Sequence, residues 1–247
     1  MKDLRDSPVP AWFWVGVPVV VYFGHYLLRV LTPDAFFDHY ILHESGATEQ
    51  GTIVVLALAL IMGLVVLREV SSLGDKRLWV FFGLFCLGCL YFGGEEASWG
   101  QHWMGWNAPD QWASLNNQNE TNLHNSNGLA GSLLDQLPRN LLSLAALIGG
   151  AIVPLVRRAR GKTYTPDSFA YWIMPGIACV PAGLIAALAS IPQKICKSIA
   201  GDVVWPMDIN AGEVKELMIA VFLFVYIVTI WLRLRHRNDE IRRLMPK

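Results

Sequence analysis

Residues 93–106 read GGEEASWGQHWMGW and follow directly on an apolar run. Glu95 and Glu96 are the first side chains after that run that could transfer a proton or bind a cation. Two carboxylates at the carboxyl end of a helix oppose the helix dipole, which makes an ordinary solvated helix end a poor explanation. We therefore predict that both are catalytic residues and metal ligands, with the nearby His102 as a further ligand.

A second group of polar residues, NNQNETNLHN, occupies residues 116–125. If residues 109–125 form a short interfacial or re-entrant helix, Asn116, Glu120 and His124 share one stripe, because residues four apart lie on the same helix face. Glu120 and His124 could then bind the same ion. We predict that Glu120 is a third catalytic residue and that one divalent metal is bound, with zinc, iron, manganese and calcium not distinguished by the pattern. The predicted metal ligands are Glu95, Glu96, Glu120, His124 and His102.

Further polar and aromatic side chains lie in the same connections, or where the last apolar run begins. A carboxylate at membrane depth is costly unless it is paired, solvated in a cavity or functional. Trp rings are typical of an interfacial belt, and a stacking platform for a sugar or lipid headgroup is the alternative. The predicted substrate-binding residues are Trp99, Gln101, Trp103, Asn116, Asn119, Asn122, Asn125, Glu44, Glu49 and Glu213.

The composition indicates what kind of scaffold must position these residues. The chain has 247 residues, of which 53% are hydrophobic and only 16% are charged, and its mean hydropathy is +0.37. Such an apolar, charge-poor chain is typical of an integral membrane protein. About 20 apolar residues cross the hydrocarbon core of a bilayer. The sequence predicts an all-α polytopic membrane helix bundle, a single transmembrane domain over residues 1–247, with spans at 11–31, 50–67, 78–95, 139–156, 168–191 and 213–232.

Several residues inside these spans are expected to serve packing rather than chemistry. Pro175 and Pro181 are tolerable in a membrane helix because neighbouring helices can satisfy the carbonyls that proline leaves without a donor. Cys86 and Cys89 lie in an apolar run and are expected to pack as small apolar side chains rather than to form a redox pair. His25 is flanked by apolar residues, which favours a packed, hydrogen-bonded imidazole.

Lys and Arg are concentrated in alternate connections and in the C-terminal stretch RLRHRNDEIRRLMPK. By the positive-inside rule, this distribution predicts that both termini are cytoplasmic and that the acidic connections lie outside. The outer connections that would form the candidate site are residues 32–49, 96–138 and 192–212. The basic segments suit contact with the lipid bilayer, and we do not expect nucleic acid as a partner.

The motif GEExSWGQ at residues 94–101, paired with NExNLHN at residues 119–125, resembles an uncharacterised family of bacterial multi-pass inner-membrane proteins. An acidic ESxxxE lead-in at residues 44–49 belongs to the same pattern, and the resemblance covers most of residues 40–130. It implies a location in the bacterial inner membrane and brings no activity with it. The family pattern has Arg at the position of His102, which argues against that residue as an essential ligand.

Three classes of function fit these observations. In the first, Glu and His ligands hold a divalent metal that activates water to hydrolyse a lipid or lipid-linked substrate. In the second, an outward-facing acidic pocket binds or transports a cation or a cationic substrate. In the third, the polar residues are a non-catalytic scaffold that ties the outer connections together. The sequence has no GxSxG, HExxH, P-loop or GxGxxG motif, so the schemes that depend on them are excluded.

Overall fold

Within the part of the chain that the structure describes, six helical spans are long and apolar enough to cross a membrane. The computed structural model describes residues 9–43, 46–110, 120–123 and 137–244. No β-strand occurs within these residues, which confirms the prediction of an all-α, multi-pass membrane bundle. The spans are Trp12–Leu31, Asp34–Leu73, Lys76–Glu96, Leu137–Ala159, Phe169–Ala200 and Ala211–Asp239.

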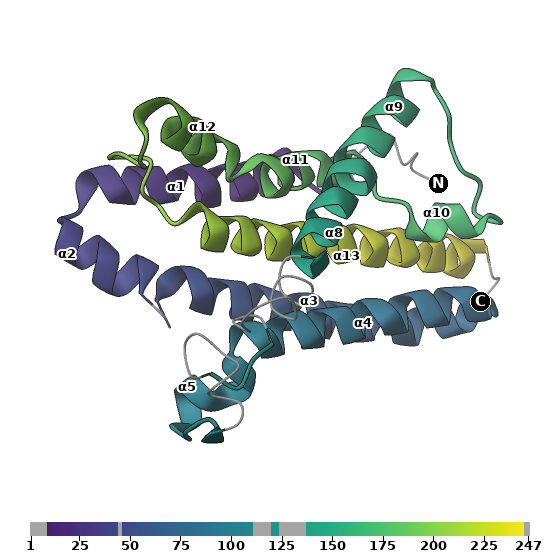
Figure 1. Ribbon diagram of the computed structural model, residues 1–247. Coiled ribbons are helices and arrows are strands. Elements are labelled where there is room, and N and C mark those ends of the chain that lie inside the picture. The colour runs from purple at the N-terminus through teal and green to yellow at the C-terminus, as the bar shows by residue number, and fades with distance from the viewer. Residues whose placement is uncertain (1–8, 44–45, 111–119, 124–136, 245–247) are drawn as a thin grey trace.

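Most spans are built from more than one helical segment, as Figure 1 shows. The first three comprise η1 (Trp12–Gly16), α1 (Val17–Leu31), α2 (Asp34–Phe37), η2 (Asp38–Leu42), α3 (Ala47–Val70), η3 (Ser71–Leu73) and α4 (Lys76–Glu96). Two short turns follow α4, namely η4 (Ser98–Gly100) and α5 (Gln101–Met104). The last three comprise α8 (Leu137–Ala145), η6 (Ala146–Ile152), α9 (Val153–Ala159), α10 (Phe169–Ile173), η7 (Ile177–Cys179), α11 (Val180–Leu188), α12 (Ile191–Ala200) and α13 (Ala211–Leu244).

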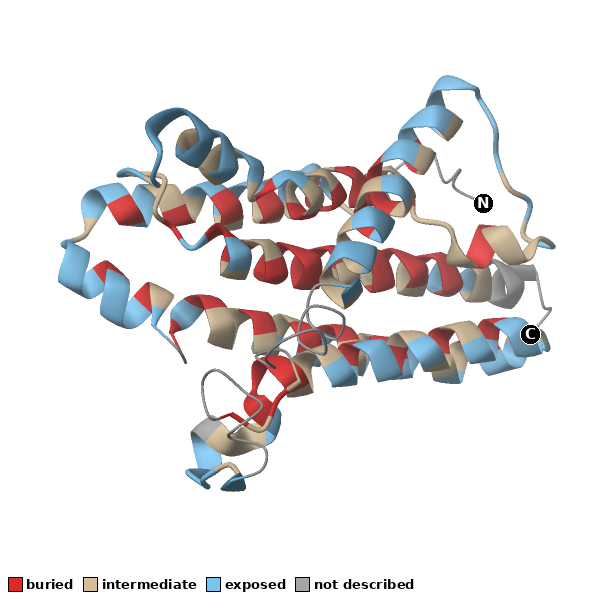
Figure 2. Ribbon diagram, in the orientation of Figure 1, coloured by how far each residue is buried: buried red, intermediate tan, exposed pale blue. Residues whose placement is uncertain are grey.

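Helix α13 lies at the centre of the bundle. Its most apolar window is 72% buried, whereas the corresponding windows of the other spans are 22 to 44% buried. It packs against α3 and α11 most extensively, and α3 in turn packs against α4. A helix that is apolar all round is covered either by neighbouring helices or by lipid, and Figure 2 shows that most of α13 is buried within the bundle.

The peripheral helices turn large apolar side chains outward. Leu84 and Leu87 of α4 are 63% and 61% exposed, and Val20 of α1 is 69% exposed. Extensive apolar exposure would be unfavourable in water, but it suits helices whose outer faces contact lipid. The surface of the bundle therefore agrees with the multi-pass assignment.

The fifth span is interrupted at Pro175, and neighbouring side chains satisfy the backbone there. Helix α10 ends at Ile173, and Met174 is extended because the residue before a proline disfavours helical backbone. The Tyr226 hydroxyl donates to the Ile173 carbonyl at 2.7 Å, and the Arg233 guanidinium donates to the Met174 carbonyl at 3.2 and 3.3 Å. This confirms the expectation that neighbours compensate for proline within the span.

The predicted outer connections at 32–49 and 192–212 contain helical segments. The first contains α2 and η2, and the second contains most of α12. Helix α12 has ten residues and is about 15 Å long, too short to cross about 30 Å of hydrocarbon. Its Ile191, Ile195 and Ile199 follow each other at four-residue spacing and are all exposed, which is typical of an amphipathic segment.

Three connections meet at one end of the bundle, at the left of Figure 1. They are the bend from α1 into α2, the turns that follow α4, and the loop from α12 to α13. The turn between α3 and α4 lies at the opposite end. The described parts of the three predicted outer connections therefore lie at one end, as the alternation of spans requires.

Candidate functional site

The backbone leaves the α-helical conformation directly after Glu96. Helix α4 ends there, and Ser98, Trp99 and Gly100 have φ angles of 43°, 55° and 98° in the left-handed region. Helix α4 therefore does not continue through residue 103, and its end at Glu96 agrees with the predicted span of 78–95. Glycine adopts this conformation at little cost, whereas Ser98 and Trp99 need tertiary contacts to hold them in it.

Glu95 supplies one of those contacts. Its Oε1 accepts a hydrogen bond from Trp99 Nε1 at 2.8 Å, and its Oε2 accepts one from the Leu123 amide at 2.7 Å. The Trp99 ring also lies over Gly94, where an added Cβ would come within 2.7 Å of the ring. Glu95 is 5% exposed, so its carboxylate joins the turn to residues 120–123 from a buried position.

Glu120 lies in a second buried hydrogen-bond group. Ser98 Oγ donates to Glu120 Oε2 at 2.9 Å, and Asn122 Nδ2 donates to the same oxygen at 2.6 Å. Asn122 Nδ2 also lies 2.9 Å from Ser98 Oγ, so the three side chains form a closed triangle. Residues 120–123 are not helical, and the predicted helical stripe through Glu120 is therefore wrong.

Gln101 completes the connection between the two sequence motifs. Its Oε1 accepts hydrogen bonds from the Thr121 amide at 2.7 Å and from the Thr121 hydroxyl at 3.1 Å. The same hydroxyl lies 2.9 Å from the Ser98 carbonyl. We call residues 95–101 and 120–123, joined in this way, the motif clamp. Its buried bonds hold the turn after α4 in place.

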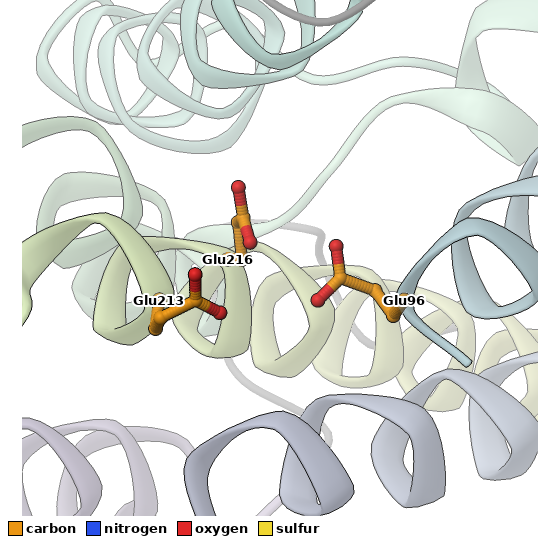
Figure 3. A group of neighbouring side chains, drawn as sticks. All are labelled: Glu96, Glu213 and Glu216. Atoms are coloured by element: carbon orange, nitrogen blue, oxygen red, sulfur yellow. The ribbon is translucent and has the colours of Figure 1, made fainter. Parts of the chain in front are cut away.

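Glu96 points away from the motif clamp and toward α13. One carboxylate oxygen from each of Glu96, Glu213 and Glu216 lies within 4.8 Å of the others, as Figure 3 shows. Glu213 and Glu216 are three residues apart and so share a face of α13. Glu96 and Glu216 are buried, and Glu213 is partly buried. We call these three residues the acidic cluster.

Two cations, Arg139 and Lys215, act on the acidic cluster. Arg139 of α8 forms an ion pair with Glu216, with 2.6 Å between Nε and Oε1. Lys215 also acts on Glu216 electrostatically. Two further carboxylates add negative charge near the cluster. Glu49 repels Glu96, and Glu120 repels Glu213.

The helix dipoles stabilise one carboxylate of the cluster and destabilise another. Glu213 lies in the first turn of α13, where the dipole favours an anion, whereas Glu96 is the last residue of α4, where the dipole disfavours one. Several buried carboxylates so close together need either a bound cation or shared protons. Among the described residues the group consists of three carboxylates, and oxygen ligands of this kind suit a hard cation such as Mg²⁺, Mn²⁺ or Ca²⁺ better than zinc.

Two cavities of different character reach this region. A polar cavity of about 400 Å³ is lined by His43, Thr48, Glu49, Asn210 and Glu213, and it leads to the cluster from the end of the bundle. An apolar groove of about 280 Å³ runs between α4, α8 and α13 and reaches Glu95 and Arg139. The cluster thus lies between a polar approach and an apolar one.

The structure divides the predicted site residues among these features. Glu95, Trp99, Gln101, Glu120 and Asn122 belong to the motif clamp, Glu96 and Glu213 to the acidic cluster, and Glu49 to the polar cavity. Trp103 is 60% exposed and lines an apolar pocket with Trp99 and Trp106. Glu44, Asn116, Asn119, His124 and Asn125, and the side chain of His102, lie outside the part of the chain that the structure describes.

Two residues of the site were missing from the predicted set. Glu216 repeats Glu213 at helical spacing where the last span begins, and Arg139 is a cation where the fourth span begins. Both signals were visible in the sequence. Their pairing was not, because 77 positions separate residues 139 and 216 and only the packing of α8 on α13 joins them.

Comparison with known proteins finds no matching family model, no matching curated protein and no matching solved structure. The resemblance to a bacterial inner-membrane family therefore stays a prediction from the two motifs.

Proposed function

We propose that this protein is a metal-dependent hydrolase that acts on a lipid or lipid-linked substrate. The observation that carries the proposal is the approach of Glu96, Glu213 and Glu216, whose carboxylate oxygens lie within 4.8 Å of one another. These oxygens would hold one divalent cation, which when bound lowers the pKa of a water ligand toward neutrality. The position of the cluster between a polar cavity and an apolar groove supports a reaction between water and a lipid.

The chain's own residues have separable roles in this proposal. Glu213 lies on the wall of the polar cavity and gives water a path to the cluster. Arg139 lies on the wall of the apolar groove and pairs with Glu216, so it would orient the anionic part of a substrate beside the cluster. The motif clamp fixes the end of α4 and thereby positions Glu96.

We further propose that the site faces the outside of a bacterial inner membrane, with both termini in the cytoplasm. The excess of Lys and Arg in the opposite connections and in the C-terminal stretch supports this orientation. The inner membrane itself is what the two sequence motifs imply.

Metal analysis of detergent-purified protein tests the proposal. We expect a near-stoichiometric divalent metal, its loss on chelation, and a lower unfolding temperature after that loss, because a ligand that binds only the folded state stabilises it. Glu96→Gln should lose the metal and any hydrolysis of bilayer lipids, measured by mass spectrometry of lipid extracts. Glu69→Gln, on α3 in an ion pair with Arg235, is the matched control.

If untreated protein contains no detectable metal and is fully stable to heat, the hydrolase proposal is contradicted. The second candidate function, a non-catalytic scaffold, would then lead. The motif clamp favours it, because the buried carboxylates of Glu95 and Glu120 make hydrogen bonds within the protein that need no ligand.

A further inference from the structure

The apolar groove between α4, α8 and α13 has an elongated lining. From α4 it takes residues from Leu84 to Glu95, which are eleven positions apart and therefore about 17 Å apart along the helix axis. Leu142 of α8 and Leu223 of α13 line it as well. An apolar groove with a lining of this length matches the shape of a hydrocarbon chain rather than that of a compact ligand.

The groove opens to the outer surface of the bundle at the depth of the bilayer. Leu84 is 63% exposed and Tyr91 is 40% exposed, and both lie within the spanning helix α4. The medium around these side chains is therefore lipid, and an acyl chain can enter sideways without crossing water.

One end of the groove is charged. Arg139 lines it there with a side chain that is 28% exposed, and its Nε is paired with Glu216 of the acidic cluster. Glu95 lies at the same end, and its two oxygens accept hydrogen bonds from Trp99 and Leu123, which offset its charge. A guanidinium is suited to a phosphate, which it can bind through parallel N–H donors.

We propose that this groove holds one acyl chain of a membrane glycerophospholipid, with the phosphate of the lipid at Arg139. The inference deepens the proposed function, because it names the class of lipid that would present an ester bond to the acidic cluster. It does not require the hydrolase to be correct, since the groove can hold a lipid whether or not the cluster holds a metal.

Gly88 offers a direct way to fill the groove. It lies in the lining, and a Cβ added there would meet no atom within 4 Å, so a larger side chain projects into open space. Gly83 on the same helix also has nothing within 4 Å of an added Cβ, but it lies outside the lining, about 140° around the helix. Gly88→Leu and Gly83→Leu are therefore a matched pair with the same change in helix propensity.

The test uses the full chain in lipid nanodiscs that contain a small fraction of a phosphatidylethanolamine with a photoreactive diazirine in one acyl chain. After irradiation, labelled peptides are mapped by mass spectrometry. We expect labelling to concentrate on residues 84–95 and 138–142, and Gly88→Leu to reduce it by about fivefold or more, whereas Gly83→Leu leaves it within about twofold of wild type. Equal labelling of all lipid-facing helices, or no effect of Gly88→Leu, would overturn the proposal.

Competition between unlabelled lipids tests whether the lipid phosphate binds at Arg139. An excess of unlabelled phosphatidylethanolamine should suppress the groove labelling several-fold more than the same excess of diacylglycerol, and equal suppression would contradict a phosphate at Arg139. Metal content measured on the same samples separates this inference from the proposed function. If the groove is labelled in protein that contains no metal, the result contradicts the hydrolase proposal and leaves the lipid site intact. If the protein contains metal but the groove is not labelled, the result contradicts the lipid site and leaves the hydrolase proposal intact.

Discussion

Glu95 and Glu96 are adjacent in the chain, yet their carboxylates belong to different structures. Glu95 accepts hydrogen bonds from Trp99 and the Leu123 amide, whereas Glu96 lies within 4.8 Å of Glu213 and Glu216. Successive helical residues point about 100° apart, so the end of α4 directs one carboxylate to the motif clamp and the other to α13. The motif clamp can thus fix the geometry of the acidic cluster without taking part in it.

Glu95→Gln should destabilise the protein by about 1–3 kcal/mol. Both oxygens of Glu95 accept hydrogen bonds, and the amide nitrogen of Gln would have to face one of the two donors. Equilibrium unfolding in mixed micelles measures the loss. Glu96→Gln is the neighbouring control, and in chelated protein it should be neutral or stabilising because it removes one of three clustered negative charges. Equal destabilisation by both substitutions would show that the two residues act together.

Acid should weaken the contact between α1 and the loop before α13. Arg29 donates to both oxygens of Asp208, at 2.9 and 2.6 Å, and these hydrogen bonds hold the pKa of Asp208 below its ordinary value of about 3.9. Because the folded pKa is the lower one, the stabilisation is complete above the ordinary pKa and is lost as pH falls through the folded pKa. Unfolding temperatures measured against pH should therefore decline less steeply in acid for Asp208→Asn than for wild type. Asp202→Asn, in the same loop, should keep the wild-type slope.

Tyr226→Phe should destabilise the protein by about 1 kcal/mol. The variant removes the hydroxyl that donates to the Ile173 carbonyl at 2.7 Å, where Pro175 interrupts the fifth span, and it leaves the ring in place. Thermal unfolding measures the effect. Tyr40→Phe, at a tyrosine that is 57% exposed, should change the unfolding temperature little. If Tyr226→Phe does not change the unfolding temperature, other donors are sufficient to stabilise the backbone at the interruption of the fifth span.

Reporter fusions should reveal the orientation of the bundle. Alkaline phosphatase fused after Asp110 should be active, because the positive-inside rule puts the turns after α4 outside, and fusion after Lys162 should be inactive. A reporter that is active only in the cytoplasm, fused at the same positions, provides the converse control. The opposite pattern would place the acidic cluster near the cytoplasmic face.

Local sequence properties determined the membrane bundle. A span needs enough apolar residues to cross the hydrocarbon core and little else, so the length of each apolar run predicted six spans that the structure contains. The effect of proline is also local, because its ring disfavours helical backbone at the residue before it. The interruption of the fifth span at Pro175 follows from this restriction. His25, expected as a packed imidazole, bonds Val21 and Thr48 from a buried position.

Only the tertiary structure decided which carboxylates meet. The sequence places Glu95, Glu96 and Glu120 within one stretch of chain and suggests that they act together, yet Glu96 meets α13 instead. The left-handed turn at Ser98–Gly100 and the packing of α4 on α3, which in turn packs on α13, determine this division. Neither is a local property: positive φ at Ser98 is costly by itself and persists because residues far along the chain bond to the turn, and helix packing depends on every side chain at the interface.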